Sequence, residues 1–102
     1  MRDPGGTVRL DATIRGGVQG VGYRFFVLRV ASRLEVTGWV ANEPDGTVRC
    51  VAEGTRGELE RLLSALREGP AAARVENVAA SWSAASGGFG SFGVRARGHS
   101  GD

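Results

Sequence analysis

The chain contains no lysine, and arginine supplies all thirteen of its basic residues. A nucleotide-binding P-loop of the Walker type needs a lysine, as do Schiff-base and pyridoxal-phosphate sites. The sequence therefore excludes these classes of site. The net charge of +2 is mild. It suits a small anionic ligand and does not by itself indicate binding to nucleic acid.

Cysteine and histidine are almost absent, since the chain has only Cys50 and His99. A single cysteine cannot form an internal disulfide, which favours a reducing compartment such as the cytoplasm. No cluster of cysteine and histidine has metal-ligand spacing, so we predict that the protein holds no metal. We expect Cys50 to be a small core residue, because its only candidate base, His99, lies in a polar tail.

Long apolar runs are also missing. No stretch approaches the roughly 20 apolar residues of a membrane span, and residues 1–6 lack the apolar segment of a signal peptide. We therefore expect a cytoplasmic protein with no membrane partner. A length of 102 residues with 41% hydrophobic content predicts one domain over 1–102, with its core at about 7–97. The tails 1–6 and 98–102 are expected to be flexible.

The hydrophobic pattern divides the chain into alternating strands and helices. Strands are predicted at 7–15, 36–41, about 47–53, 75–84 and 92–96. A helix is predicted at 22–34, and a second helix follows the capping-box spacing of Thr55 and Glu58 and ends at Gly69. Hairpin turns are predicted at 43–46 and 86–90. The order β-α-β-β-α-β predicts an α+β, ferredoxin-like sandwich, an antiparallel sheet with two helices on one face.

A glycine-rich run joins the first predicted strand to the first predicted helix. Residues 16–24 read Gly-Gly-Val-Gln-Gly-Val-Gly-Tyr-Arg. Glycines allow backbone N–H groups to approach a ligand, and a helix N-terminus adds unpaired donors, so the run favours an anion such as phosphate. Arg24 adds a fixed positive charge and a planar set of donors. On glycine content alone, a turn that needs glycine only for its geometry fits as well.

Two segments resemble the acylphosphatase family, and the resemblance covers residues 7–97. The first runs from Ile14 to Arg24, and the second reads Gly-Trp-Val-Ala-Asn-Glu-Pro-Asp-Gly-Thr-Val over residues 38–48, with Gly54 beyond it. Members of this family hydrolyse acyl phosphates to a carboxylate and inorganic phosphate without a metal. The resemblance implies that Arg24 binds the phosphoryl group and that Asn42 orients the attacking water. The phosphate-binding positions that it implies are Gly16, Gly17, Val18, Gln19, Gly20, Val21, Gly22, Tyr23 and Arg24.

The chemistry of an acyl phosphate agrees with these assignments. The leaving carboxylate has a conjugate acid of pKa roughly 4, so no general acid is required. Catalysis then depends mainly on positioning and on charge stabilisation, which N–H groups and one guanidinium can supply. The amide oxygen of Asn42 can accept a proton from water and set its direction, with a phosphate oxygen of the substrate taking the proton. Gln19 is expected to brace the loop through hydrogen bonds.

The chain departs from the family pattern at three positions. Gly17 stands where a basic residue is frequent, Arg15 where a histidine is common, and Tyr23 where phenylalanine is usual. Gly17 lowers the positive charge of the loop, and we expect Arg15 to restore part of it. Trp39 and Trp82 are expected to be structural.

Other functions remain possible on the same order of elements. RNA-recognition domains share this order, but residues 88–92 match their aromatic motif poorly and the predicted strand 47–53 has no aromatic residue. We therefore predict no nucleic acid partner. A non-catalytic anion-binding or regulatory module is the main alternative. The preferred interpretation is a monomeric acylphosphatase that acts on a small-molecule acyl phosphate without a cofactor.

Overall fold

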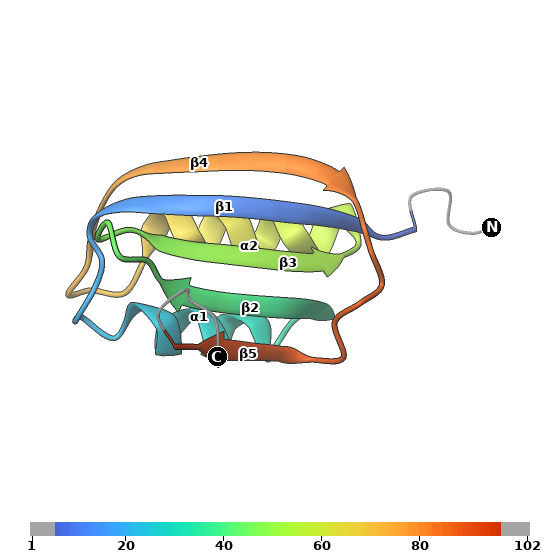
Figure 1. Ribbon diagram of the computed structural model, residues 1–102, viewed down its shortest axis with the longest axis horizontal. Helices are drawn as coiled ribbons and strands as arrows, with labels where there is room; N and C mark the ends of the chain where they lie inside the picture. The colour runs from blue at the N-terminus through green and yellow to red at the C-terminus, as the bar shows by residue number, and fades with distance from the viewer. Residues whose placement is uncertain (1–5, 97–102) are drawn as a thin grey trace.

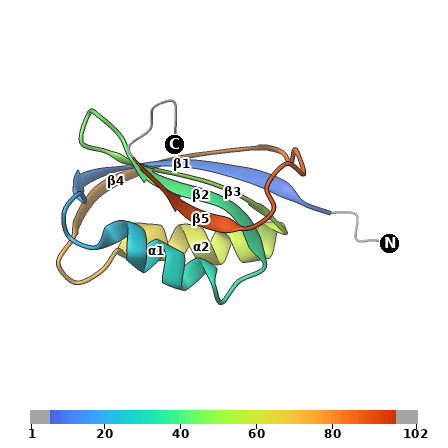
Figure 2. The same cartoon turned by 60° about the horizontal axis from the view of Figure 1, so that its bottom comes forward.

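The computed structural model describes residues 6–96 as one five-stranded sheet with two helices packed on one of its faces (Figures 1 and 2). The elements are β1 (Val8–Gly17), α1 (Tyr23–Ala31), β2 (Val36–Asn42), β3 (Val48–Gly54), α2 (Arg56–Glu68), β4 (Arg74–Ala84) and β5 (Phe92–Arg95). The strands lie in the order β4-β1-β3-β2-β5. The predicted ferredoxin-like α+β fold is confirmed, and no helix formed by residues 6–96 covers the second face of the sheet.

The alternation of apolar residues in β1 places its side chains as predicted. Leu10, Ala12 and Ile14 are fully buried under the helices, and Ala12 pairs with Cys50 of β3. Helix α2 contributes a stripe of buried leucines to the same core, namely Leu59, Leu62, Leu63 and Leu66. Cys50 is fully buried, so its predicted place in the core is confirmed.

Both helices begin and end through local hydrogen bonds. Helix α1 is shorter than the predicted 22–34, because Arg33 and Leu34 donate to carbonyls only three residues back and tighten the chain into a turn. At the start of α2, the Thr55 hydroxyl accepts from the N–H of Glu58 at 3.3 Å, which is half of a capping box. The Glu58 carboxylate instead accepts from the N–H of Glu35 at 3.0 Å, which ties α2 to the segment before β2.

The hairpin predicted at 86–90 is wrong. Strands β4 and β5 lie at opposite edges of the sheet, and β5 runs parallel to β2, with Gly38 opposite Phe92 (Figure 1). The sheet is therefore mixed, because β5 adds a parallel edge to four antiparallel strands. The buried carboxylate of Glu53 anchors the connection by accepting from the N–H groups of Ser86 and Gly87 at 2.8 and 2.9 Å. Glycine and serine content favours a turn but does not reveal where the next strand pairs.

The first strand extends two residues beyond its predicted end. Gly16 and Gly17 pair with Val75 and Arg74 of β4 after a register shift between Arg15 and Gly16. The predicted start of the loop at Gly16 is therefore wrong, and the loop proper covers residues 18–22. No helix within residues 6–96 has the length and apolar character needed to cross a lipid bilayer. His99 and most of the two predicted tails lie outside the described residues.

Candidate functional site

A small cavity forms where the loop after β1, the start of α1 and the end of β2 meet. Its volume is about 220 Å³, below the roughly 300–1,000 Å³ of pockets for drug-sized ligands, so it suits a small ligand. Its lining residues are Val18, Gly20, Gly22, Tyr23, Arg24, Phe25 and Asn42. The fold thus brings Arg24 and Asn42 together from different elements. Gly16, Gly17, Gln19 and Val21 are not among the lining residues.

The backbone from residue 19 to residue 25 presents a row of unused donors beside this cavity. Within residues 6–96, the N–H groups of this segment donate no hydrogen bond, and the first intrahelical bond of α1 comes from Phe26 to the carbonyl of Gly22 at 3.0 Å. Gly22 lies at the helix N-cap with φ of 77°, a conformation that glycine adopts without strain. The N-terminus of α1 therefore points free N–H groups and its partial positive charge at the cavity.

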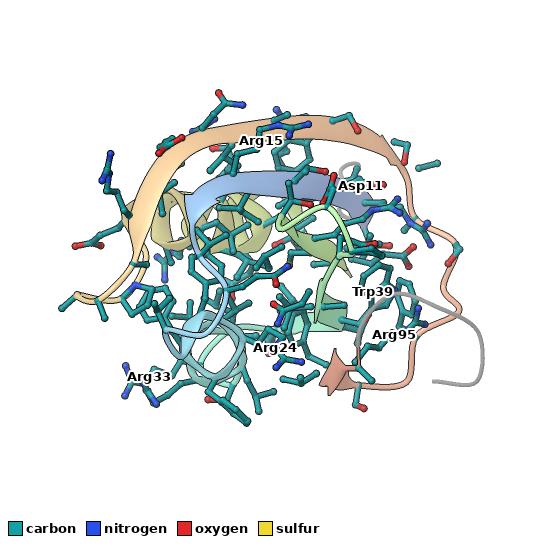
Figure 3. The ribbon with its side chains drawn as sticks, turned by 60° about the vertical axis from the view of Figure 1, so that its left-hand side comes forward. Asp11, Arg15, Arg24, Arg33, Trp39 and Arg95 are labelled. Atoms are coloured by element: carbon teal, nitrogen blue, oxygen red, sulfur yellow. The ribbon has the colours of Figure 1, made fainter. Side chains whose placement is uncertain are left out.

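Arg24 is the charged side chain of the cavity. Its Nη1 donates to the backbone carbonyl of Arg95 in β5 at 3.2 Å, and no carboxylate within the described residues forms an ion pair with it. Figure 3 shows Arg24 between α1 and β5, with Trp39 and Arg95 lying together beside it. A guanidinium has five N–H donors, so one bond to a carbonyl leaves donors for an anion.

Asn42 is the last residue of β2 and lies at the edge of the cavity. Its side-chain amide makes no hydrogen bond with any other described residue, which leaves both the oxygen and the NH₂ group available. The hairpin after Asn42 is held to the loop by Gln19, whose Nε2 donates to the carbonyls of Glu43 and Thr47 at 2.8 Å each. The predicted bracing role of the Gln19 side chain is confirmed.

The buried side chains of Tyr23 and Val18 anchor the loop to the core. Tyr23 is buried, and its hydroxyl donates to the carbonyl of Leu66 in α2 at 2.7 Å. Burial raises the pKa of Tyr23 well above its usual range, so the hydroxyl stays neutral and acts as a structural donor. Val18 is buried as well, which roots the loop in the core. Only the backbone of Tyr23 can belong to an anion cradle.

Phe25 is a cavity residue that the sequence analysis missed. Its side chain is 61% exposed, although it follows Arg24 directly in the first turn of α1. The buried stripe of α1 is formed by Val27 and Ala31, with Phe26, Val30 and Leu34 half-buried beside it. An apolar residue that falls outside this stripe was the signal that could have identified it.

A second, larger groove lies on the open face of the sheet and contains no predicted site residue. It has a volume of about 700 Å³ and is lined by residues of β1, β3 and β4 and by the hairpin 43–47. Arg15 lines this groove and not the small cavity, and its expected contribution to the positive charge of the loop stays a prediction. Successive side chains of β1 project to opposite faces of the sheet, so Arg15 points to the open face. The loop and Arg24 lie on the face that the helices cover. The Arg49 guanidinium in the groove already pairs with Asp11 at 2.6 Å.

Cys50 takes no part in either cavity. Burial raises the pKa of the Cys50 thiol to about 12, with the negative charge of Asp11 as a smaller cause. The thiolate, which is the nucleophilic form, is therefore absent at neutral pH.

Comparisons with known proteins agree on one family. The model of the acylphosphatase family matches residues 10–94. An acylphosphatase of Salinibacter ruber is 55% identical over 87 residues, which cover 85% of this chain and 92% of that protein. The acylphosphatase of Bacillus subtilis has a crystal structure that superposes with a TM-score of 0.83 at 31% identity, covering 86% of this chain and 98% of that one. An acylphosphatase of Coxiella burnetii superposes with a TM-score of 0.81 at 37% identity, covering 88% and 94% of the two chains.

Proposed function

The chain belongs to the acylphosphatase family of enzymes, and we propose that it hydrolyses the carboxyl–phosphate bond of acyl phosphates. The products are a carboxylate and inorganic phosphate. One observation carries the proposal beyond family membership. Arg24, the residues Gly20 and 22–25 with their free N–H groups, and Asn42 with its unbonded amide all line a single small cavity. This arrangement offers positive charge, fixed dipoles and a water-orienting group within one space.

In the proposed mechanism, the loop and Arg24 hold the phosphoryl group. The N–H groups of the cavity-lining residues Gly20 and 22–25 and the Arg24 guanidinium donate to the phosphate oxygens, whose negative charge must be stabilised as the transition state forms. Gly16 and Gly17 do not line the cavity, so their part in the proposal is to shape the entry of the loop. The amide oxygen of Asn42 accepts one proton of the attacking water and aligns its oxygen with phosphorus.

The chemistry balances without a further acid or base. Water oxygen forms the new bond to phosphorus, the bond between phosphorus and the acyl oxygen breaks, and that oxygen leaves as a carboxylate. A conjugate acid of pKa about 4 means that the leaving group needs no protonation at neutral pH. The proton of the water passes to a phosphate oxygen. The reaction is therefore proposed to run without a metal.

The test is hydrolysis of acetyl phosphate and benzoyl phosphate by the purified protein, with and without a chelator. Turnover that survives chelation is expected.

Asn42→Ala should lower kcat by about 10²-fold or more while inorganic phosphate still binds, because only water alignment is lost. Arg24→Ala should lower kcat/KM by about 10³-fold or more and abolish phosphate binding as well.

Matched controls separate these effects from a general loss of arginine or asparagine. Arg33 follows the end of α1 and is exposed, and Figure 3 shows it pointing outward, away from Arg24; Asn77 is exposed on β4. Arg33→Ala and Asn77→Ala should therefore retain full activity. Phosphate binding without any turnover of acyl phosphates would instead support a non-catalytic anion-binding module. Activity that disappears only with chelator would overturn the metal-free mechanism.

A further inference from the structure

Phe25 differs from every other large apolar residue in the described part of the chain, because it alone is exposed. Single exposed apolar residues are common and need no explanation by themselves. This one, however, lies at the candidate site. It lines the cavity together with Gly20, Gly22 and Asn42 and follows Arg24 directly. Its position rather than its exposure alone calls for a function.

The other aromatic rings between residues 6 and 96 have partners within the protein. Tyr23 and Phe26 pack against each other with ring centroids 6.1 Å apart, and Phe92 packs against the core. Arginine guanidinium groups lie over the remaining rings, namely Trp39, Trp82 and Phe89. No aromatic or cation–π partner of this kind accompanies the ring of Phe25 in the same range of residues. The exposed ring of Phe25 is therefore available for contact with a ligand at the cavity.

Three successive residues at the start of α1 project in different directions because of helix geometry. Successive side chains project about 100° apart around a helix, since 3.6 residues make a turn. Tyr23 therefore points into the core and Arg24 toward β5, which leaves Phe25 on the solvent side of the cavity. A phosphoryl group held by Arg24 and the loop carries its acyl group through a single bridging oxygen. The acyl group must then lie at the mouth of the same small cavity.

The chemistry of the cavity favours an apolar acyl group. Its lining residues include Val18 and Phe25 and no acidic residue, and Arg24 is the only charged residue among them. We propose that Phe25 is a specificity-determining residue that contacts the acyl group and favours acyl phosphates with an aromatic or bulky apolar acyl group over acetyl phosphate. This inference rests on the proposed hydrolysis of acyl phosphates.

The test compares kcat/KM for benzoyl phosphate with kcat/KM for acetyl phosphate. The wild-type ratio should favour benzoyl phosphate, and Phe25→Ala should lower that ratio by about tenfold, because an aromatic contact is lost. Phe25→Trp should keep it. The control is Phe89→Ala, which removes a ring that already lies under the Arg9 guanidinium, and the ratio should not change. A ratio that is the same in the wild type and Phe25→Ala would overturn the inference.

A binding measurement separates failure of this inference from failure of the proposed function. Phenacylphosphonate and acetonylphosphonate are non-hydrolysable analogues of benzoyl and acetyl phosphate. The wild type should bind phenacylphosphonate more tightly by about tenfold, and Phe25→Ala should remove that difference. If Phe25→Ala removes the difference in affinity but the wild type hydrolyses neither acyl phosphate, the proposed hydrolysis is refuted and the contact between Phe25 and the acyl group stands. If the wild type hydrolyses acyl phosphates but binds the two analogues with equal affinity, the proposed hydrolysis stands and the role of Phe25 is refuted.

Discussion

Gly16 and Gly17 are neighbours in β1, but only Gly16 needs to be glycine. Gly16 has φ of 129°, and a Cβ at this position would lie 2.1 Å from the carbonyl oxygen of Arg74 in β4. At Gly17 a Cβ would make an ordinary contact of 3.6 Å with the Cβ of Arg74. The first glycine therefore permits close pairing of β1 with β4, whereas the second leaves room for a side chain.

This difference predicts opposite outcomes for two adjacent substitutions. Gly16→Ala should lower the free energy of unfolding by about 3 kcal/mol or more, because positive φ and a backbone clash add together. Gly17→Ala should stay within about 1 kcal/mol of the wild type and retain its activity. Thermal or urea unfolding of both variants checks the pair. Severe destabilisation by Gly17→Ala would contradict this account of the strand end.

At the scale of elements, β5 links the open face of the sheet to the cavity. Its Arg95 carbonyl accepts from Arg24, and its Arg95 guanidinium lies 4.4 Å from the ring centre of Trp39 in β2. The N–H of Gly38 donates to the carbonyl of Ser91 at 2.9 Å just before β5 begins. These contacts add to the ladder that holds the short parallel strand β5 against β2, and the strand supplies the carbonyl to which Arg24 donates.

Removing the Trp39 ring should loosen this edge and affect the site from a distance. Trp39→Ala should cost about 1–3 kcal/mol of stability and lower kcat/KM for acetyl phosphate by about tenfold, because small misplacements of a binding group are costly. Trp82→Ala is the matched control, since Trp82 stacks under Arg56 at 3.8 Å on the opposite side of the sheet. It should lose stability but retain activity. Equal activity in the two variants would refute the link through β5.

At the scale of the whole molecule, Glu53 connects three distant parts of the chain. Its carboxylate on β3 accepts from Arg9 on β1 and from Ser86 and Gly87 in the connection that leads to β5. Burial would by itself raise the pKa of Glu53, but these hydrogen bonds outweigh it and lower the pKa to about 2. The charged form of this side chain is thus preferred in the folded protein.

The lowered pKa predicts a defined pH dependence of stability. The pKa of Glu53 lies near 4.5, the ordinary value of a glutamate, in the unfolded chain and at about 2 in the folded one. Its contribution is therefore fully present above about pH 4.5 and disappears as the pH falls toward 2. Glu53→Gln should be less stable than the wild type at pH 7, and the difference should shrink across that window. Urea unfolding from pH 7 down to pH 2 measures it, and a constant difference would contradict the role of the charge.

The sequence predicted most elements because their signals are local. Alternating apolar residues identified β1, the spacing of leucines identified α2, and Gly69 marked where that helix ends. The contribution of Gln19 was also predictable, because an amide beside a glycine loop finds backbone carbonyls readily. The limits of β1 and α1 were less accurate, because pairing with β4 and short-range turns decided them.

The amino-acid sequence by itself determined the order of the elements, the buried faces of β1, α1 and α2, the single family to which the chain belongs and the two candidate residues Arg24 and Asn42. Each of these depends on residue type and on spacing along the chain. Only the tertiary structure decided that β5 pairs parallel to β2, that β1 continues through Gly16 and Gly17 beside β4 and that Phe25 lies at the cavity beside Arg24. These features depend on contacts between segments that are distant in the sequence. A local pattern of residue types does not specify such contacts.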